Sequence, residues 1–422
     1  MAIVPNPHGT TGLMGWIDDR FPWTKLVKDH ATEYYAAKTF NFWYVFGVLA
    51  TVVLVNQLIT GIFLTMHYKP SALEAFGSVE YIMRDVPFGW LIRYMHSTGA
   101  SAFFIVIYLH MFRGILYGSY RQPRELIWIF GWMIFLALMA EGFMGYVLPW
   151  GNMSYWGAQV IINLFGAIPM IGPDLVDWIR GDFLISDATL NRFFALHVIA
   201  LPFVIVGLVF AHLMALHEVG SNNPDGIEIK KHKDENGIPL DGIAFHPFHT
   251  SKDLVAIVIF MILFAGVIFF APEMGGYFIE PPNFTPANPL VTPSHIAPVW
   301  YFTPFYSVLR AVTYPLFGVD AKFWGVIAMG ASVVIIAFLP WLDRSPVKSI
   351  RYKSPIFAWV LGVFVVAFVV LGYLGFEPAT PRNTAIAQVC TVIYFGFFLL
   401  MPWYSKLGTA KPVPERVTGY EK

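Results

Sequence analysis

Four histidines in two apolar segments are the residues best placed to bind metals. His96 and His110 are 14 residues apart, and His197 and His212 are 15 residues apart. An α-helix turns about 100° and rises about 1.5 Å per residue, so each second histidine returns near the face of the first, roughly 21 to 22 Å further along. Two helices with this pattern can hold two stacked metal centres.

Four glycines repeat this spacing on two other apolar segments. Gly47 and Gly61 are 14 residues apart, and so are Gly131 and Gly145. Glycine lets the edge of a flat ring approach a helix, although it is also common in membrane helices for packing alone. A lone intramembrane histidine often only bonds a neighbouring helix, and bare zinc or copper usually recruits carboxylate, thiolate or a third imidazole. The combined pattern favours haem held by two axial imidazoles.

The composition is that of a membrane protein. The chain is 57% hydrophobic and only 13% charged, whereas soluble proteins are about 25% charged. Its zero net charge suggests no nucleic-acid partner. We predict an all-α integral membrane protein with eight transmembrane helices, whose N-terminal four-helix bundle holds two stacked b haems. The segments long enough to cross about 30 Å of hydrocarbon are 41–66, 90–114, 126–148, 190–216, 253–271, 323–342, 355–374 and 384–404.

The distribution of basic residues predicts the orientation in the membrane. Eight spans put both termini on one side, and most of the 27 Lys and Arg residues lie in loops on that side. Because basic loops stay in the cytoplasm, we expect both termini to be cytoplasmic. His96 and His197 then lie near the outer face, and His110 and His212 lie near the inner face, so the ligands pair by depth.

Cysteine usage limits the cofactors. Cys390 is the only cysteine, so the chain has no C-x-x-C-H haem attachment and no ligand set for an iron–sulfur cluster. Any haem is held without thioether bonds, and any iron–sulfur centre belongs to another subunit. Arg93, Arg113 and Arg192 flank the ligand region, where a guanidinium can pair with haem propionates or extend to the lipid headgroups.

Several sequence motifs occur together in one order along nearly the whole chain. They are R-Y-M-H-S-T-G-A-S (93–101), G-Y-V-L-P-W-G-N-M-S-Y-W-G-A (145–158), R-F-F-A-L-H (192–197), L-H-E-V-G-S-N-N-P (216–224), T-P-A-N-P-L (285–290) and P-V-W-Y (298–301). With these motifs the chain resembles cytochrome b of the bacterial respiratory ubiquinol–cytochrome c reductase, which is complex III of the respiratory chain.

This resemblance implies two non-covalent b haems. His96 and His197 would ligate a low-potential haem near the outer face, and His110 and His212 a high-potential haem near the inner face. The resemblance also places Arg93 and Arg192 at the outer haem's propionates and Arg113, Ser119 and Trp128 near the inner haem.

An outer quinol site is also implied, where the loop after the third helix meets the charge-poor connection 272–322. Its lining would be Tyr146, Gly157, Val299, Trp300, Tyr301 and Tyr306. Many relatives carry P-E-W-Y, whose glutamate is proposed to accept a quinol proton, and the valine of this chain cannot do so. Either Glu273 or Glu280 substitutes, or water and a histidine of the iron–sulfur partner suffice; the sequence leaves both open.

An inner quinone site is implied after the fourth helix and at the start of the fifth. His217 and Ser221 would lie on one side of the ring, with Lys252 and Asp253 on the other, where imidazole and carboxylate can deliver protons. From position alone, Asp253 could instead stabilise a helix N-terminus. Three other histidines in the segment between the two halves are expected at the surface: His232, His246 and His249.

The spacing of His197 and His212 departs from many respiratory relatives. This chain has 14 intervening residues, as chloroplast relatives do, where respiratory cytochromes b often have 13. An extra residue rotates the second ligand by about 100° unless the helix absorbs it, so we expect a local bulge near Pro202. The unsplit chain with eight spans nevertheless favours the respiratory complex.

We expect four parts: a dihaem half (1–224), a cytoplasmic connecting loop (225–251), a C-terminal half with the outer quinol loop (252–405) and a cytoplasmic tail (406–422). The implied activity is that of the catalytic subunit of a quinol–cytochrome c reductase. Ubiquinol oxidised at the outer site gives one electron to a Rieske-type iron–sulfur protein and a membrane-anchored c-type cytochrome. The other electron crosses through the haems to quinone at the inner site, and protons are translocated.

The complex is expected as a homodimer in the bacterial inner membrane, crossed many times by this chain. A dihaem membrane anchor of a dehydrogenase and a transporter are the alternatives. An anchor does not require a charge-poor outer loop of about 50 residues or eight spans. Transporters often consist of two repeated halves, and the first four helices of this chain show no convincing similarity to the last four.

Overall fold

The computed structural model describes residues 11–419, and these form helices with one small two-stranded sheet. Residues 1–10 of the expected dihaem half and 420–422 of the expected tail lie outside the described residues. The helices are α1 (Gly12–Asp18), α2 (Trp23–Val27), α3 (Phe46–Thr65), α4 (Ala75–Arg84), α5 (Gly89–Tyr117), α6 (Glu125–Val147), α7 (Asn152–Phe165), α8 (Gly172–Arg180), α9 (Asp187–Ala195), α10 (Leu201–Val219), α11 (Phe245–Phe270), α12 (Thr303–Ala311), α13 (Ala321–Val334), α14 (Leu339–Leu342), α15 (Pro355–Phe376), α16 (Pro381–Leu399) and α17 (Met401–Tyr404). The strands are β1 (Tyr35–Ala37) and β2 (Gly242–Ala244).

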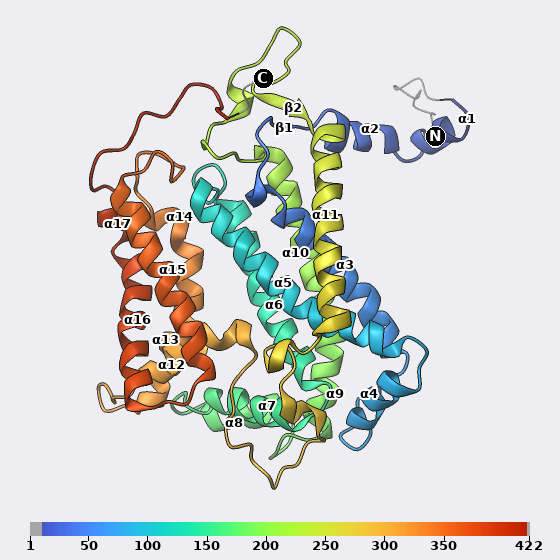
Figure 1. Cartoon of the computed structure of the whole chain (residues 1–422), viewed down its shortest axis with the longest axis vertical. Helices are drawn as coiled ribbons and strands as arrows, with labels where there is room; N and C mark the ends of the chain where they lie inside the picture. Colours follow the sequence, from blue (N-terminus) through green and yellow to red (C-terminus); the bar gives the residue numbers. More distant parts are fainter. Residues whose placement is uncertain (1–10, 420–422) are drawn as a thin grey trace.

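The long helices form two groups that run roughly alongside each other (Figure 1). The N-terminal group contains α3, α5, α6, α10 and α11, with α3 packed along α5 and α10 packed along α6. The C-terminal group contains α12 to α17, in which α15 packs on both α12 and α16. The helices α1 and α2 and strands β1 and β2 lie at one end of the molecule, and α4, α7 and α8 lie at the other (Figure 1).

Among residues 11–419, seven helical segments are long and apolar enough to cross a membrane. They match seven of the eight predicted spans, and large apolar side chains such as Ile62 and Phe203 are exposed on them, as contact with lipid requires. The eighth prediction, 384–404, corresponds to α16 and α17. Arg382, Asn383 and Gln388 lower the hydropathy of α16, so it is not one of the seven, and its crossing stays a prediction.

The buried core joins the two groups of helices. One apolar cluster contains Phe104 and Phe135 of the N-terminal group together with Tyr301 and Phe305 from the segment that precedes and forms α12. Tyr301 stacks on Phe104 with ring centroids 3.8 Å apart. The residues before α12 are therefore held against the N-terminal helices, beside the predicted outer site.

The segment between the two halves contains a β-strand and buried side chains. Its strand β2 pairs antiparallel with β1, and Asp225 and Asp241 are buried. His249 is fully buried and its Nε2 lies 3.0 Å from the Ala37 carbonyl oxygen, so its expected place at the surface is wrong. His246 is exposed, as expected.

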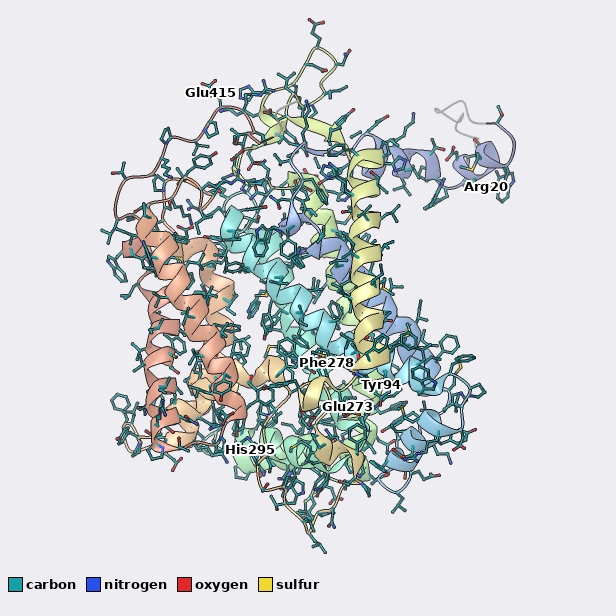
Figure 2. The ribbon with its side chains drawn as sticks, in the orientation of Figure 1. Arg20, Tyr94, Glu273, Phe278, His295 and Glu415 are labelled. Carbon is teal, nitrogen blue, oxygen red and sulfur yellow. The ribbon has the colours of Figure 1, made fainter. Side chains whose placement is uncertain are left out.

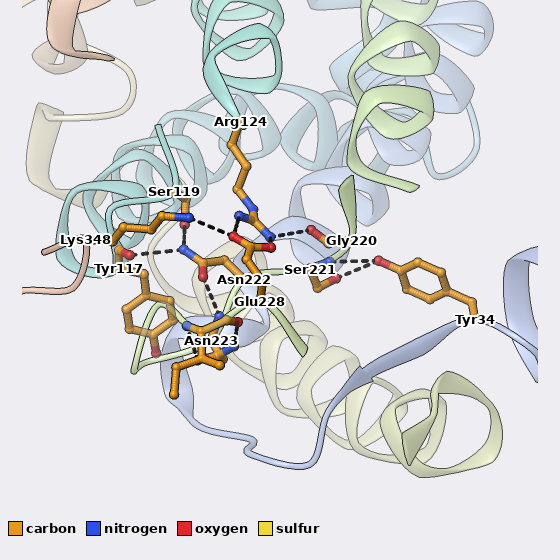
Figure 3. Close-up of polar contacts among 11 residues, drawn as sticks. Tyr34, Tyr117, Ser119, Arg124, Gly220, Ser221, Asn222, Asn223, Glu228 and Lys348 are labelled. Atoms are coloured by element: carbon orange, nitrogen blue, oxygen red, sulfur yellow. Dashed lines mark hydrogen bonds and ion pairs between the residues drawn. The ribbon is translucent and has the colours of Figure 1, made fainter. Parts of the chain in front are cut away.

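Polar contacts tie this segment to both groups of helices (Figure 3). The carboxylate of Glu228 accepts hydrogen bonds from Arg124 at 2.5 Å and from Lys348 at 2.8 Å. Arg124 precedes α6 and Lys348 precedes α15, so one carboxylate joins the two halves. Charge-assisted bonds of this kind are stronger than neutral ones.

Candidate functional site

The four histidines form two pairs, one above the other, between the helices of the N-terminal group. The ring centroids of His96 and His197 are 6.2 Å apart, and those of His110 and His212 are 6.3 Å apart. Two metal–nitrogen bonds of about 2 Å, and about 1.1 Å from each nitrogen to its ring centroid, span about 6 Å. Each pair is therefore spaced to hold one metal ion between two imidazoles.

Hydrogen bonds at Nδ1 orient three of these rings. Nδ1 of His96 lies 2.9 Å from the Thr60 hydroxyl, Nδ1 of His197 lies 3.0 Å from the Glu141 carbonyl oxygen, and Nδ1 of His212 lies 2.9 Å from the Ile127 carbonyl oxygen. A carbonyl acceptor fixes the proton on Nδ1 and directs the lone pair of Nε2 towards a metal. The donor set fits iron ligated by two neutral imidazoles.

A π-helical turn (Leu196–Ala200) absorbs the extra residue between His197 and His212. It follows α9 and ends two residues before Pro202, near which a bulge was expected, so this prediction is confirmed. A π turn contains one residue more than an α turn, so it resets the helix by about 100°. Both imidazoles consequently reach partners on the same helix, α5.

Each of the four glycines faces one ligand histidine. A Cβ atom added at Gly47 would lie 3.6 Å from His110, one at Gly61 would lie 3.3 Å from His96, and one at Gly131 would lie 3.3 Å from His212. At Gly145 it would overlap the ring of His197. The spacing of the glycines therefore matches that of the histidines because each glycine gives one imidazole its room.

A cavity of about 290 Å³ surrounds the outer pair. Gly61, Gly145 and Arg93 line it together with both histidines. Among residues 11–419, no three His, Cys, Asp or Glu side chains gather as a site for a bare metal ion. An apolar cavity with two facing imidazoles and a cationic side chain fits a haem, whereas a bare metal ion would need further ligands.

The arginines differ in how well they fit a haem propionate. Arg113 lies 3.4 Å from His110 Nδ1, and its buried Nε has no partner among the described residues. An anionic group at that position would satisfy it. Arg192 instead donates a hydrogen bond to the carbonyl oxygen of Trp178 on α8. Arg93 lines the cavity around the outer histidine pair and Arg192 is not among its lining residues, so the expected role of Arg192 at a propionate stays a prediction.

The other two residues expected near the inner haem make contacts within the protein. Ser119 Oγ accepts a hydrogen bond from the Asn222 side chain at 3.0 Å (Figure 3). The indole nitrogen of Trp128 donates to the Ile336 carbonyl oxygen at 2.8 Å, which ties α6 to the C-terminal group.

The structure brings the predicted outer-site residues together. Tyr146, Gly157, Val299 and Tyr306 line one small apolar cleft. Tyr146, Val299 and Tyr301 also line the larger cavity around the outer histidine pair, so the two spaces adjoin. The indole nitrogen of Trp300 donates to the hydroxyl of Ser101, another residue lining that cavity, at 3.1 Å.

Two polar residues, Glu280 and Asn283, contact Tyr146 beside this cleft. The Tyr146 hydroxyl donates to Glu280 Oε2 at 3.1 Å, and Asn283 donates to the same oxygen at 3.0 Å. Burial raises the pKa of Glu280 to about 7, against the opposing effect of hydrogen bonds that include those from Tyr146 and Asn283. Glu280 had been one of two possible substitutes, and nothing in the sequence pointed to Asn283.

The predicted inner-site residues are divided between two packing environments. Tyr34, which sequence reasoning missed, stacks on His217 with ring centroids 4.5 Å apart, and its hydroxyl lies 2.9 Å from Ser221 Oγ. Lys252 lies over the ring of Phe248 at 3.4 Å. Asp253 is in the first part of α11, one residue further along.

Comparison with known proteins gives a consistent result over both halves. Residues 31–220 match the family model described as "Cytochrome b/b6/petB", and residues 286–395 match "Cytochrome b(C-terminal)/b6/petD". A protein named cytochrome b from Allochromatium vinosum is 62% identical over 412 residues, covering 97% of this chain and 99% of that protein. One with the same name from Rickettsia bellii is 47% identical, covering 98% and 99%.

The fold is also similar to a solved structure. A chain of a structure described as "Hyperthermophilic respiratory Complex III" superposes with a TM-score of 0.85 at 38% identity. The match covers 93% of this chain and 98% of that one.

Proposed function

Because the chain belongs to the cytochrome b family of respiratory complex III, we propose that it is the dihaem catalytic subunit of a ubiquinol–cytochrome c reductase. The observation that carries this proposal is the pair of imidazole separations, 6.2 and 6.3 Å, at two levels of one helical bundle. His96 and His197 would hold the outer iron, and His110 and His212 the inner iron.

The protein would hold the two haems in position and exclude water from them. Haem, when bound, supplies one-electron transfer between the two levels of the membrane. The four glycines give the imidazoles room between closely packed helices, and the apolar walls would keep solvent from a bound haem. Arg93 and Arg113 would neutralise propionates where the two haem sites approach the membrane surfaces.

Ubiquinol would bind in the cleft of Tyr146, Gly157, Val299 and Tyr306, beside the outer histidine pair. Trp300 and Tyr301 fix the wall of this site through Ser101 and Phe104. Oxidation of ubiquinol in this cleft would send one electron to an iron–sulfur partner and the other towards the inner face. Moving one charge against the membrane potential costs about 2.3 kcal/mol per 100 mV, so the inner haem needs the higher potential.

Quinone would be reduced near the inner face. His217 and Asp253 would hydrogen-bond its two carbonyl oxygens and deliver protons, with Ser221 and Lys252 nearby. The stacking of Tyr34 on His217 supports this site, because it fixes the plane of the imidazole that must face the substrate.

A Rieske-type iron–sulfur protein and a membrane-anchored c-type cytochrome would complete the assembly, as a homodimer in the bacterial inner membrane with both termini cytoplasmic. Two observations support this arrangement. The fold is similar to a chain of a respiratory complex III, and α1 and the segment before residue 419 lie at one end of the molecule.

The direct test uses the complete complex purified from the native membrane. Added ubiquinol should reduce cytochrome c, and reduced-minus-oxidised spectra should show two b-type haems per copy of this chain. A preparation with both haems but without quinol–cytochrome c activity would contradict the proposed reaction, and would point instead to a dihaem anchor.

A further inference from the structure

The outer quinol cleft lacks a proton acceptor where many relatives have one, and a different carboxylate lies beside it. Val299 is buried in the wall of the cleft and carries no acceptor. Glu280 lies on the same larger cavity as Val299 and Tyr146, although it is 19 residues earlier in the chain. Tyr146 lines both spaces and bonds Glu280, so it connects this carboxylate to the wall of the cleft.

The two oxygens of Glu280 have different surroundings. Oε2 accepts hydrogen bonds from Tyr146 at 3.1 Å and Asn283 at 3.0 Å, and Asn283 also donates to the Tyr146 hydroxyl at 3.1 Å. Oε1 is buried and has no hydrogen-bond partner among residues 11–419. A buried carboxylate oxygen without a hydrogen-bond partner is unfavourable, so a ligand that donates a hydrogen bond to it is favoured.

We propose that Glu280 accepts the first proton of the quinol at the outer site, in place of the glutamate that Val299 replaces. The inference deepens the proposed function and rests on it. The quinol O–H bond breaks, a new O–H bond forms at Glu280 Oε1, and the bonding pair stays on the quinol oxygen. The electrons then leave one at a time, the first to the iron–sulfur partner.

Glu141 is the other carboxylate on this cavity, but its Oε1 lies 3.1 Å from Nδ1 of the ligand histidine His197, whereas Glu280 bonds Tyr146 in the wall of the cleft. The ionisable groups that face Glu280 are Tyr146 from α6 and Tyr301 from the turn before α12. The remaining ionisable groups lining the cavity are Arg93, His96, Tyr68, Glu141 and His197. Glu273 is exposed near the end of α11, in the region of Tyr94 (Figure 2), and does not line this cavity.

The pH dependence has a definite sign. Only the ionised carboxylate accepts a proton, and the buried carboxyl of Glu280 ionises at a pKa of about 7, above its ordinary value. Turnover in the assembled complex should therefore rise with pH through about 7 and then level off. This limb belongs to Glu280 and should disappear with its carboxylate.

The test is the Glu280→Gln variant of the complete complex, assayed for ubiquinol–cytochrome c turnover from about pH 5.5 to about pH 9. The amide keeps an oxygen for Tyr146 and Asn283 but accepts no proton, so kcat should fall about 100-fold and its pH limb should flatten. The spectra of both haems should be unchanged. Glu273→Gln is the matched control and should keep the rate and pH profile of the unmodified complex.

Two further variants keep the inference falsifiable if Glu280→Gln assembles poorly. Glu280→Asp retains a carboxylate and should keep a pH limb with a lower kcat, and a flat profile would overturn the inference. Adding Val299→Glu to the Glu280→Gln variant should raise kcat at least about tenfold above that of Glu280→Gln alone. Glu280→Gln with unaltered turnover and pH profile would also overturn it. An unmodified complex without haem or activity would instead refute the proposed function.

Discussion

Gly145 lies against His197 so closely that a single methyl group at position 145 would overlap the imidazole. The same relationship, with more room, links Gly61 to His96, Gly131 to His212 and Gly47 to His110. The four glycines are therefore part of the ligand geometry itself. They allow two helices to pass close to the rings that would hold the metals.

Replacing Gly145 with alanine should displace the ring of His197. Because the overlap is with a fixed imidazole and not with a flexible chain end, we expect Gly145→Ala to lose most of the outer haem signal while the inner signal remains. Gly207→Ala is the control, since a Cβ atom there meets nothing within 4 Å. The reduced-minus-oxidised spectrum of each variant measures this. An intact outer haem in Gly145→Ala would show that the ring moves without cost.

Removing one ligand should affect one level of the membrane only. His96→Leu takes away one imidazole of the outer pair and leaves His110 and His212 6.3 Å apart. We expect the outer haem signal to disappear and the inner signal to survive at least in part. His232→Leu, in the connecting segment, should leave both signals unchanged. Equal loss of both haems in His96→Leu, in a folded and membrane-inserted protein, would contradict the pairing by depth.

Asp343 and Lys353 form a buried ion pair that should contribute strongly to stability. Their charged atoms are 2.5 Å apart, both side chains are almost completely buried, and burial lowers the pKa of Lys353 to about 8 despite the nearby carboxylate. Asp343→Leu leaves a buried ammonium without its partner and should cost about 3–5 kcal/mol of unfolding free energy.

Adding Lys353→Met to that variant should recover part of the loss, because it removes the buried ammonium, while Arg121, which lies 3.3 Å from Asp343, still lacks its carboxylate. The midpoint of thermal unfolding in detergent measures both variants. Arg84→Met, which removes an exposed pair with Glu80, should change the unfolding free energy by less than about 1 kcal/mol. A double variant no more stable than Asp343→Leu would argue against the unpaired charge as the cause.

Tyr34 should affect quinone reduction at the inner face. Tyr34→Phe keeps the ring that stacks on His217 but removes the hydroxyl that contacts Ser221. Loss of this hydrogen bond should raise the free-energy barrier of the reaction by about 1 kcal/mol. Electron exchange between quinone and the inner haem should then be about fivefold slower. A complex depleted of its iron–sulfur protein isolates this step, since quinol then reduces haem only through the inner site.

Tyr314→Phe is the matched control, because Tyr314 is 73% exposed and lies in the C-terminal half. It should not alter the rate. An unchanged rate in Tyr34→Phe would mean that the tyrosine only braces the N-terminal segment.

Much of the fold could be predicted because apolar length alone determines a membrane helix. Seven predicted spans agree with candidate membrane helices of the structure to within a few residues, except that α11 starts earlier, at Phe245. The helical repeat also predicted the histidine pairs correctly, since His96 lies against His197 and His110 lies against His212. The bulge before Pro202 followed from counting residues between two ligands.

Contacts between distant segments could not be predicted in the same way. His249 was expected at the surface with the rest of the connecting segment, yet it is buried and its Nε2 lies 3.0 Å from the carbonyl oxygen of Ala37 in β1. Tyr34 lies 183 residues before His217 in the chain, and only the folded structure brings their rings together. Glu280 and Asn283 reach Tyr146 by an irregular loop path that no periodic pattern describes.

The haem content of the chain, purified with its complex under mild conditions, decides whether the two histidine pairs hold iron. A pyridine haemochrome assay together with a reduced-minus-oxidised spectrum gives the number and type of haems per chain. We expect two non-covalent b haems with distinguishable spectra or potentials. A folded, intact chain that contains no haem, or only one in every preparation, would refute the dihaem arrangement.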